Sequence, residues 1–192
     1  MLIEALQFLI HTLFGLVATA FWLRFYLQWA RVPFHHPFAQ FVIRVTDFAV
    51  RPLRRVIPGL FGLDWSSLLP FLFIEILAVA LIELLSGFPF SIAGASVLSS
   101  LLLLGIAAAL RLVLQTFVIL VIGQAVLSWV SPVSPASALF HALTAPILNP
   151  LRRIIPPLAG GVDLSPIAAF ILIQLVLMLP VTLLEQSARA ML

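Results

Sequence analysis

Two arginine pairs in matching proline frames are the polar feature of the sequence with the clearest chemical use. Residues 52–58 read P-L-R-R-V-I-P, and residues 150–156 read P-L-R-R-I-I-P, 98 residues later. Arginine side chains suit lipid phosphates, and the flanking leucine and isoleucine suit acyl chains. The alternative is that the arginines only anchor the chain on one side of a membrane. We expect a lipid- or partner-binding motif made of Pro52, Arg54, Arg55, Pro58, Asn149, Pro150, Arg152, Arg153 and Pro156.

Each arginine pair is followed by an aspartate that stands directly before an apolar run. These residues are Asp64 and Asp163, and Ser66 and Ser165 come two positions after them. A carboxylate at the start of a helix accepts hydrogen bonds from free backbone N–H groups and suits the positive end of the helix dipole. Helix capping is therefore the favoured interpretation. The alternative is an ion pair between Asp64 and Arg54 or Arg55.

Four further polar residues fall inside long apolar runs: Arg24, Glu75, Gln124 and Gln174. Glu75 lies about 16 Å beyond Asp64 along a helix, near the centre of a bilayer. We expect it to face the inside of a helix bundle and to pair with Gln174, Gln124, Gln115 or Arg24. Hydrogen bonding between helices is the favoured role for such groups. An ion- or proton-conducting step is the alternative.

No catalytic, cofactor or metal-binding pattern accompanies these residues. The sequence contains no cysteine, so thiol nucleophiles and cysteine-ligated metals are excluded. His35 and His36 are adjacent, but no third ligand of the right type stands nearby. We expect a protein that is not an enzyme and that has no metal site and no cofactor.

Composition indicates where such residues must be positioned. Of the 192 residues, 63% are hydrophobic and only 9% are charged, whereas a soluble domain is about half apolar and about a quarter charged. The mean hydropathy is +1.23. An integral membrane protein is predicted. The formal net charge of +3 is too small to favour nucleic-acid binding.

Four stretches are long and apolar enough to cross a bilayer, which takes about 20 helical residues. We place them at residues 2–29, 65–85, 106–130 and 164–184. Arg111, about 27 Å from Trp129 along a helix, then lies near the opposite interface as a snorkelling residue.

The connection between the first two spans also contains an amphipathic helix. Its apolar face comprises Phe38, Phe41, Val42, Val45, Phe48 and Ala49, and its polar face comprises Gln40, Arg44, Asp47 and Arg51. The equivalent stretch, residues 138–148, is more apolar.

Charge is distributed unequally among the connections. Five arginines lie between the first two spans, two lie between the last two, and residues 86–96 carry no charge. Positive residues remain on the cytoplasmic side. Both arginine-bearing connections are therefore predicted to be cytoplasmic, with both termini and the middle connection on the far side.

The chain is an internal duplication of residues 1–96 and 97–192. Trp29 matches Trp129, Asp64 matches Asp163, and Glu75 matches Gln174. We expect an all-α membrane protein: four transmembrane helices in two tandem helix–loop–helix repeats, each with an interfacial amphipathic helix between its two helices. Two spans per repeat give both repeats one orientation and a pseudo-symmetry axis along the membrane normal.

The second copy of the motif, Asn149 to Pro156 followed by D-L-S-P-I at residues 163–167, resembles the repeat of the YggT family. The first copy differs, with Arg51 in place of Asn149 and Ser67 in place of Pro166. The resemblance covers nearly the whole chain as two YGGT repeats. It implies a multi-pass protein of the bacterial cytoplasmic (inner) membrane that is linked to osmotic or extracytoplasmic stress.

Together these features predict a non-enzymatic membrane organiser or stress-response factor that acts through lipid or protein partners. The expected partners are the bilayer, anionic lipid headgroups, a membrane protein not identified by the sequence, and further copies of the chain in a homo-oligomer. The alternative is a small ion channel or transporter that is active as an oligomer.

Overall fold

The computed structural model describes residues 1–33, 36–57, 64–88, 96–155 and 163–191. The regular structure in these ranges is helical throughout, and four of the helices are long and apolar enough to cross a membrane. The predicted all-α class is therefore confirmed. The elements are α1 (Leu2–Trp29), α2 (Pro37–Val56), α3 (Trp65–Leu85), α4 (Ser96–Val130), α5 (Pro135–Ile154), α6 (Ser165–Val176), the π-helix η1 (Leu177–Val181) and α7 (Thr182–Arg189).

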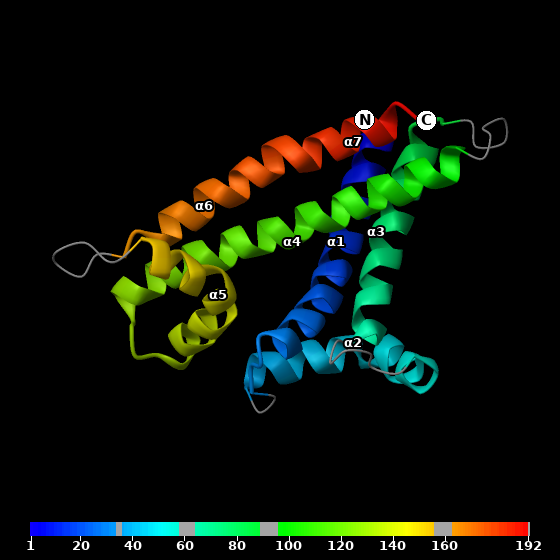
Figure 1. Cartoon of the computed structure of the whole chain (residues 1–192). Helices are drawn as coiled ribbons and strands as arrows, with labels where there is room; N and C mark the ends of the chain where they lie inside the picture. Colours follow the sequence, from blue (N-terminus) through cyan, green and yellow to red (C-terminus); the bar gives the residue numbers. More distant parts are fainter. Residues whose placement is uncertain (34–35, 58–63, 89–95, 156–162, 192) are drawn as a thin grey trace.

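The helices form two arms, one from each repeat (Figure 1). In the first arm α1 packs on α3, and in the second α4 packs on α6 and α7. The arms are joined where α3 packs on α4, close to both chain termini. Helices α2 and α5 lie at the other ends of the two arms. We call this side the motif end, because α2 and α5 carry the arginine pairs.

The first two spans match their predicted bounds, whereas the last two are longer than predicted. Helix α4 begins at Ser96, ten residues before the predicted start. Its additional turns are held by packing on α7, where the Ser100 hydroxyl donates to the carbonyl of Ala188. The fourth span continues to Arg189 through η1, which contains Pro180. A proline has no N–H to donate, and a π-helical turn accommodates this gap without ending the helix.

Helices α2 and α5 are equivalent along their whole length. Each has 20 residues and a proline at its start, after N-caps His36 and Ser134. Pro52 and Pro150 do not start turns of their own, because both lie inside these longer helices. Each of these prolines removes one backbone hydrogen bond from its helix. The arginines in the last turn stabilise the helix by interacting with the negative end of its dipole. Pro58 and Pro156 lie outside the described residues.

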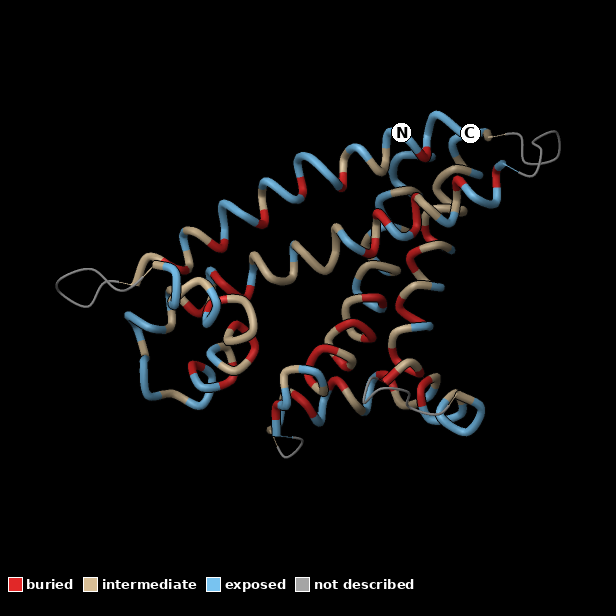
Figure 2. Tube along the Cα trace, in the orientation of Figure 1, coloured by how far each residue is buried: buried red, intermediate tan, exposed pale blue. Residues whose placement is uncertain are grey.

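Helix α2 has three faces instead of the predicted two. The residues buried against the first arm are Ala39, Val42, Thr46 and Val50. A second, apolar face is exposed and comprises Phe41, Val45, Phe48 and Val56. A third face is polar and exposed, with Gln40, Arg44, Arg51 and Arg55. The predicted single apolar face is thus divided, because only part of it contacts α1 and α3. Figure 2 shows the alternation of buried and exposed positions along the helix.

An aromatic cluster joins the two repeats near the motif end. Trp22 and Tyr26 of α1 contact Phe117 of α4, with ring centroids 6.0 and 5.0 Å apart. Phe71 of α3 packs on Trp22 at 5.8 Å. The Tyr26 hydroxyl donates to the carbonyl of Leu143 in α5. These contacts position the motif-bearing helices relative to the spans.

Candidate functional site: the repeated arginine–aspartate pairs

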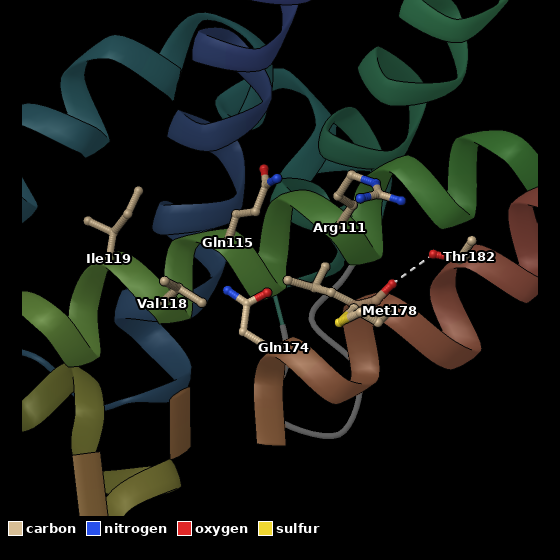
Figure 3. Close-up of a pocket in the computed structure, with 8 residues that line it drawn as sticks. Arg111, Gln115, Val118, Ile119, Gln174, Met178 and Thr182 are labelled. Carbon is tan, nitrogen blue, oxygen red and sulfur yellow. Dashed lines mark hydrogen bonds between the residues drawn. The ribbon is translucent and has the colours of Figure 1, made fainter. Parts of the chain in front are cut away.

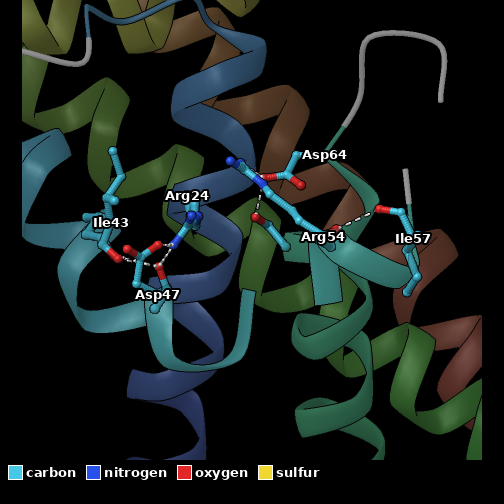
Figure 4. Close-up of polar contacts among 10 residues, drawn as sticks. Arg24, Ile43, Asp47, Arg54, Ile57 and Asp64 are labelled. Carbon is cyan, nitrogen blue, oxygen red and sulfur yellow. Dashed lines mark hydrogen bonds and ion pairs between the residues drawn. The ribbon is translucent and has the colours of Figure 1, made fainter. Parts of the chain in front are cut away.

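In the first repeat, Arg54 near the end of α2 pairs with Asp64, the residue before α3 (Figure 4). Its Nη2 atom lies 2.5 Å from Oδ2 of Asp64, whose side chain is only 4% exposed. The Ser67 hydroxyl donates to the same oxygen at 2.7 Å. Burial raises the pKa of Asp64, but the hydrogen bonds from Arg54 and Ser67 and the arginine charge outweigh it and hold that pKa below its ordinary value.

The second repeat contains the equivalent pair. Arg152 Nε lies 2.8 Å from Oδ2 of Asp163, and the backbone N–H of Ser165 donates to Oδ1 at 2.9 Å. Here too burial raises the pKa of the aspartate. The hydrogen bonds from Ser165 and Arg152 and the arginine charge outweigh this effect, so that the pKa lies below its ordinary value. Asp163 thus combines the ion pair with a hydrogen bond from the first residue of α6, while the N-cap position itself is Leu164. Asp64 makes the ion pair and receives no side-chain cap bond from the backbone.

The two serines of the motif lie beside these pairs but differ in their bonding. The Ser66 hydroxyl donates to the carbonyl of Ile57 at 3.2 Å, which connects the end of α2 to the start of α3. The Ser165 hydroxyl is buried, and within the described part of the chain it has no partner.

The second arginine of each pair is not the partner of the aspartate. Arg55 and Arg153 are exposed, and neither makes an ion pair with any residue that the structure describes. Each is followed by an exposed apolar side chain, Val56 at 79% and Ile154 at 76% exposure. In both repeats a free cation and an exposed apolar side chain therefore stand next to each other.

A hollow of about 380 Å³ lies beside the second motif. It is lined by Ala145, Pro146, Asn149, Pro150 and Arg153. The Asn149 side-chain oxygen accepts a long hydrogen bond from Arg152, at 3.4 Å. Arg153 is the cationic side chain among these lining residues, and within the described part of the chain it makes no ion pair.

Arg24 holds α2 against α1. It is 6% exposed, and its Nη1 atom lies 2.8 Å from Oδ1 of Asp47, 2.9 Å from the Thr46 hydroxyl and 3.1 Å from the carbonyl of Ile43. Figure 4 shows Arg24 reaching from α1 to these groups. Arg24 therefore pairs with α2 and not with Glu75. At the equivalent positions the second repeat has Gln124, Thr144 and Ala145, and the buried Oε1 of Gln124 has no partner within the described ranges.

The residues predicted to pair with Glu75 do not form hydrogen bonds with it in the described structure. Glu75 is buried on α3, and among the described residues it makes no hydrogen bond to Gln174, Gln124, Gln115 or Arg24. Gln174 instead lies in a hollow of about 480 Å³ between α4 and the α6–η1–α7 span, together with Gln115 and Arg111 (Figure 3). Arg111 is held there by two-pronged hydrogen bonding to Glu185, at 2.7 to 2.9 Å. It is an ion-paired residue and not a freely snorkelling one.

The matched pairs occur at equivalent positions of two copies of one unit, and a family model matches the same two units. The model described as CCB3/YggT matches residues 3–85 and 103–184. The chain belongs to the CCB3/YggT family. The two matched segments start 100 residues apart and end 99 residues apart, and the spacings of Trp29 to Trp129 and of Asp64 to Asp163 have the same values.

Three relatives are similar over most of their length, and each carries a name that marks it as uncharacterised. A protein of Pseudomonas aeruginosa is 37% identical over 174 residues, covering 90% of this chain and 86% of its own. A Vibrio alginolyticus protein from the proC 3′ region is 36% identical, covering 89% and 90%. The YggT protein of Escherichia coli K12 is 34% identical, covering 90% and 87%. No solved structure matches the chain.

Proposed function

We propose that this YggT-family protein is a non-enzymatic organiser of the bacterial cytoplasmic (inner) membrane that binds anionic lipid headgroups at the cytoplasmic surface. The observation that carries the proposal is the different use of the two arginines in each motif. Arg54 and Arg152 are neutralised by aspartates, whereas Arg55 and Arg153 are exposed and unpaired in the described structure. An ion pair that only anchored the chain would not need a free neighbour in both copies.

The apolar groups around the free arginines support a site at the level of lipid headgroups. Val56 and Ile154 are exposed, and so are Phe41 and Phe48 on the outer apolar face of α2. A helix with exposed apolar residues beside arginines lies in the interface, with its apolar face among acyl chains and its cations among phosphates. The excess of arginine in the motif-bearing connections supports a cytoplasmic position for this end.

Lipid binding is tested by comparing the wild type with the double variant Arg55→Gln/Arg153→Gln. Each protein is extracted in mild detergent, offered equal amounts of phosphatidylglycerol and phosphatidylethanolamine, and examined by native mass spectrometry. The wild type should retain phosphatidylglycerol preferentially, and the double variant should lose that preference. Arg189→Gln, at the other end of the molecule and 66% exposed, is the matched control and should behave as the wild type. Equal retention by all three proteins would contradict the proposal.

A role under osmotic stress is part of the same proposal. A strain that lacks the protein should grow more slowly after an osmotic upshift, and the wild-type gene should restore growth. The double variant should restore it less well at equal abundance. If the double variant complements fully, lipid binding by these arginines is not what the cell uses.

A small channel or transporter is the second candidate, and the hollow between α4 and the fourth span is the observation that favours it. Gln115, Gln174 and Arg111 give this hollow polar walls within the spans, and polar groups at such depth often mark solute pathways. Purified protein in liposomes should then pass small ions, and Gln174→Leu should reduce the flux. Absence of flux from the wild type removes this candidate.

A further inference from the structure

The contact between the two repeats is made by surfaces that do not match each other. On the first repeat the contact uses α3, together with Trp22 and Tyr26 of α1. On the second repeat it uses Leu143 of α5, whose carbonyl accepts from Tyr26, and one face of α4, which comprises Gly105, Ala109, Val113 and Phe117. A contact between two different surfaces of one repeated unit leaves each surface unused once at the ends of the series.

Close packing at this contact depends on Gly105. A Cβ atom placed on Gly105 would lie 2.3 Å from Cγ1 of Ile76, so only glycine allows α4 to approach α3 this closely. Small residues are what permit helices to pack together inside membranes. Near this crossing, Ala109 is buried and Leu68 and Leu72 of α3 are partly buried in the same core cluster.

The first unused surface lies on α1. The residues of α1 equivalent to Gly105, Ala109, Val113 and Phe117 are Ala5, Leu9, Leu13 and Val17. All four are exposed, the three large ones at 50%, 58% and 43%. We call this set the α1 face. Alanine at position 5 is also small, but its Cβ prevents as close an approach as Gly105 allows, so a contact made by the α1 face is wider at this point.

The second unused surface lies on the outer side of the second repeat. Leu68, Leu72 and Ile76 of α3 are equivalent to Ile167, Ile171 and Leu175 of α6, which are 58%, 51% and 47% exposed. Trp22 and Tyr26 are equivalent to Ile122 and Val126 of α4, which are 49% and 54% exposed. Helix α6 packs on α4 and α5, and its other side is open (Figures 1 and 2). We call these five residues the α6 face.

We infer that a second copy of the chain binds the α6 face with its own α1 face, repeating the contact that α4 makes with the first repeat. Both faces are apolar, both lie within the spans, and each is the counterpart of a surface that is packed inside the chain. Because all copies span the membrane in one orientation, repetition of this contact proceeds around an axis along the membrane normal, and it closes into a ring when the rotation between copies divides a full turn. A dimer is the smallest such ring, and in it no α1 or α6 face is left open.

Disulfide trapping tests this contact, since the chain has no cysteine of its own. One chain carries Ala5→Cys and one tag, a second carries Leu175→Cys and another tag, and both are expressed in the same cells. Oxidation of isolated membranes should yield a covalent dimer with both tags. Leu9→Cys with Ile171→Cys is a second pair, so that the result does not depend on one substitution.

Two controls separate the predicted contact from chance collision and from failed oxidation. Phe8 and Leu172 are 68% and 49% exposed on the same helices but do not belong to the α1 face or the α6 face. The pair Phe8→Cys with Leu172→Cys should therefore form no covalent dimer. Gln7 and Ser86 are hydrogen-bonded within one chain at 3.0 Å, so Gln7→Cys/Ser86→Cys in one chain should oxidise internally.

Three results would overturn the inference. The first is absence of the mixed dimer for both test pairs while the internal control oxidises. The second is equal cross-linking by the control pair Phe8 and Leu172. The third is a dimer that forms equally well with Ala5→Cys alone, which would show a contact between identical surfaces.

Discussion

At the scale of single residues, the two arginines of each motif have opposite environments. Arg54 contacts the carboxylate of Asp64, which is almost fully buried, while Arg55 is exposed and makes no ion pair with a described residue. Removal of a partner from a buried charge costs the desolvation of that charge, whereas removal of an exposed, unpaired side chain costs little. Although the two arginines are neighbours in the sequence, their substitution should have different effects on the free energy of unfolding.

Arg54→Ala should therefore lower the free energy of unfolding by about 2 kcal/mol, less than for a fully buried pair because Arg54 is 51% exposed. Arg55→Ala is the matched control and should change it by less than about 0.5 kcal/mol. Thermal unfolding in detergent, followed by circular dichroism, measures both. Equal losses for the two variants would show that the ion pair has no special role in folding.

The aspartates also predict how stability depends on pH. Their pKa values lie below the ordinary value of 3.8 in the folded protein. A carboxyl with a lowered folded-state pKa contributes stability above its unfolded-state pKa, and this contribution is lost as the pH falls through the folded-state pKa. Unfolding free energy should thus fall as the pH drops below about 3.8. In Asp64→Asn/Asp163→Asn the fall over this range should be smaller; an unchanged fall would assign acid sensitivity to other groups.

At the scale of helices, the two repeats attach their amphipathic helices in different ways. In the first repeat Arg24 bonds to Thr46 and Asp47. In the second repeat Gln124 and Ala145 replace the charged residues, while Thr144 is kept and buried like Thr46. The second copy therefore lacks both charges of the ion pair, so no buried charge is left without its counter-ion.

This difference provides a test built from the chain's own second copy. Asp47→Ala alone leaves the charge of Arg24 buried and should cost about 2 kcal/mol of unfolding free energy. Adding Arg24→Gln reproduces the second repeat and should recover about 1 kcal/mol of that loss. A double-mutant cycle measured by thermal unfolding gives the coupling. Strictly additive effects would mean that Asp47 does not stabilise α2 on α1 through Arg24.

Helix positions followed from the sequence where uninterrupted apolar length decided them, but not at Pro52 and Pro150, which lie inside helices. The spans of α1 and α3 were predictable from uninterrupted apolar residues. For the aspartates the sequence favoured helix capping, and an ion pair of Asp64 with Arg54 or Arg55 was the alternative. The early start of α4 was not predictable, because the packing of Ser100 on α7 is a contact between distant residues. The threonines at positions 46 and 144 share the 98-residue spacing of the motif, a signal that would have located the buried side of α2 and α5.

The candidate site was only partly predictable for the same reason. Local sequence indicated which residues are polar, but not which arginine of a pair meets the aspartate, since that depends on the direction of the last turn of α2. Nor did it indicate that Glu75 and Gln174 lie apart. Glu75 is on α3 of the first arm, whereas Gln174 lines the hollow between α4 and the fourth span in the second arm.

At the scale of the whole molecule, the account depends on which side of the membrane the motif end faces. The arms place α2 and α5, with both arginine pairs, away from the chain termini (Figure 1). Anionic lipid attracts arginines at the cytoplasmic surface, and positive residues remain on that side during insertion. If the motif end faced outward, neither the free arginines nor the outer apolar face of α2 would have the proposed use.

Sided labelling of single cysteines in intact cells tests this claim most directly, because the chain has no cysteine of its own. Gln40→Cys and Val133→Cys mark the motif end, and Glu4→Cys and Ser187→Cys mark the end with the termini; all four positions are exposed. A membrane-impermeant maleimide should label positions 4 and 187 in intact cells, and positions 40 and 133 only after the cells are opened. Labelling of positions 40 and 133 in intact cells, with positions 4 and 187 protected, would contradict the account.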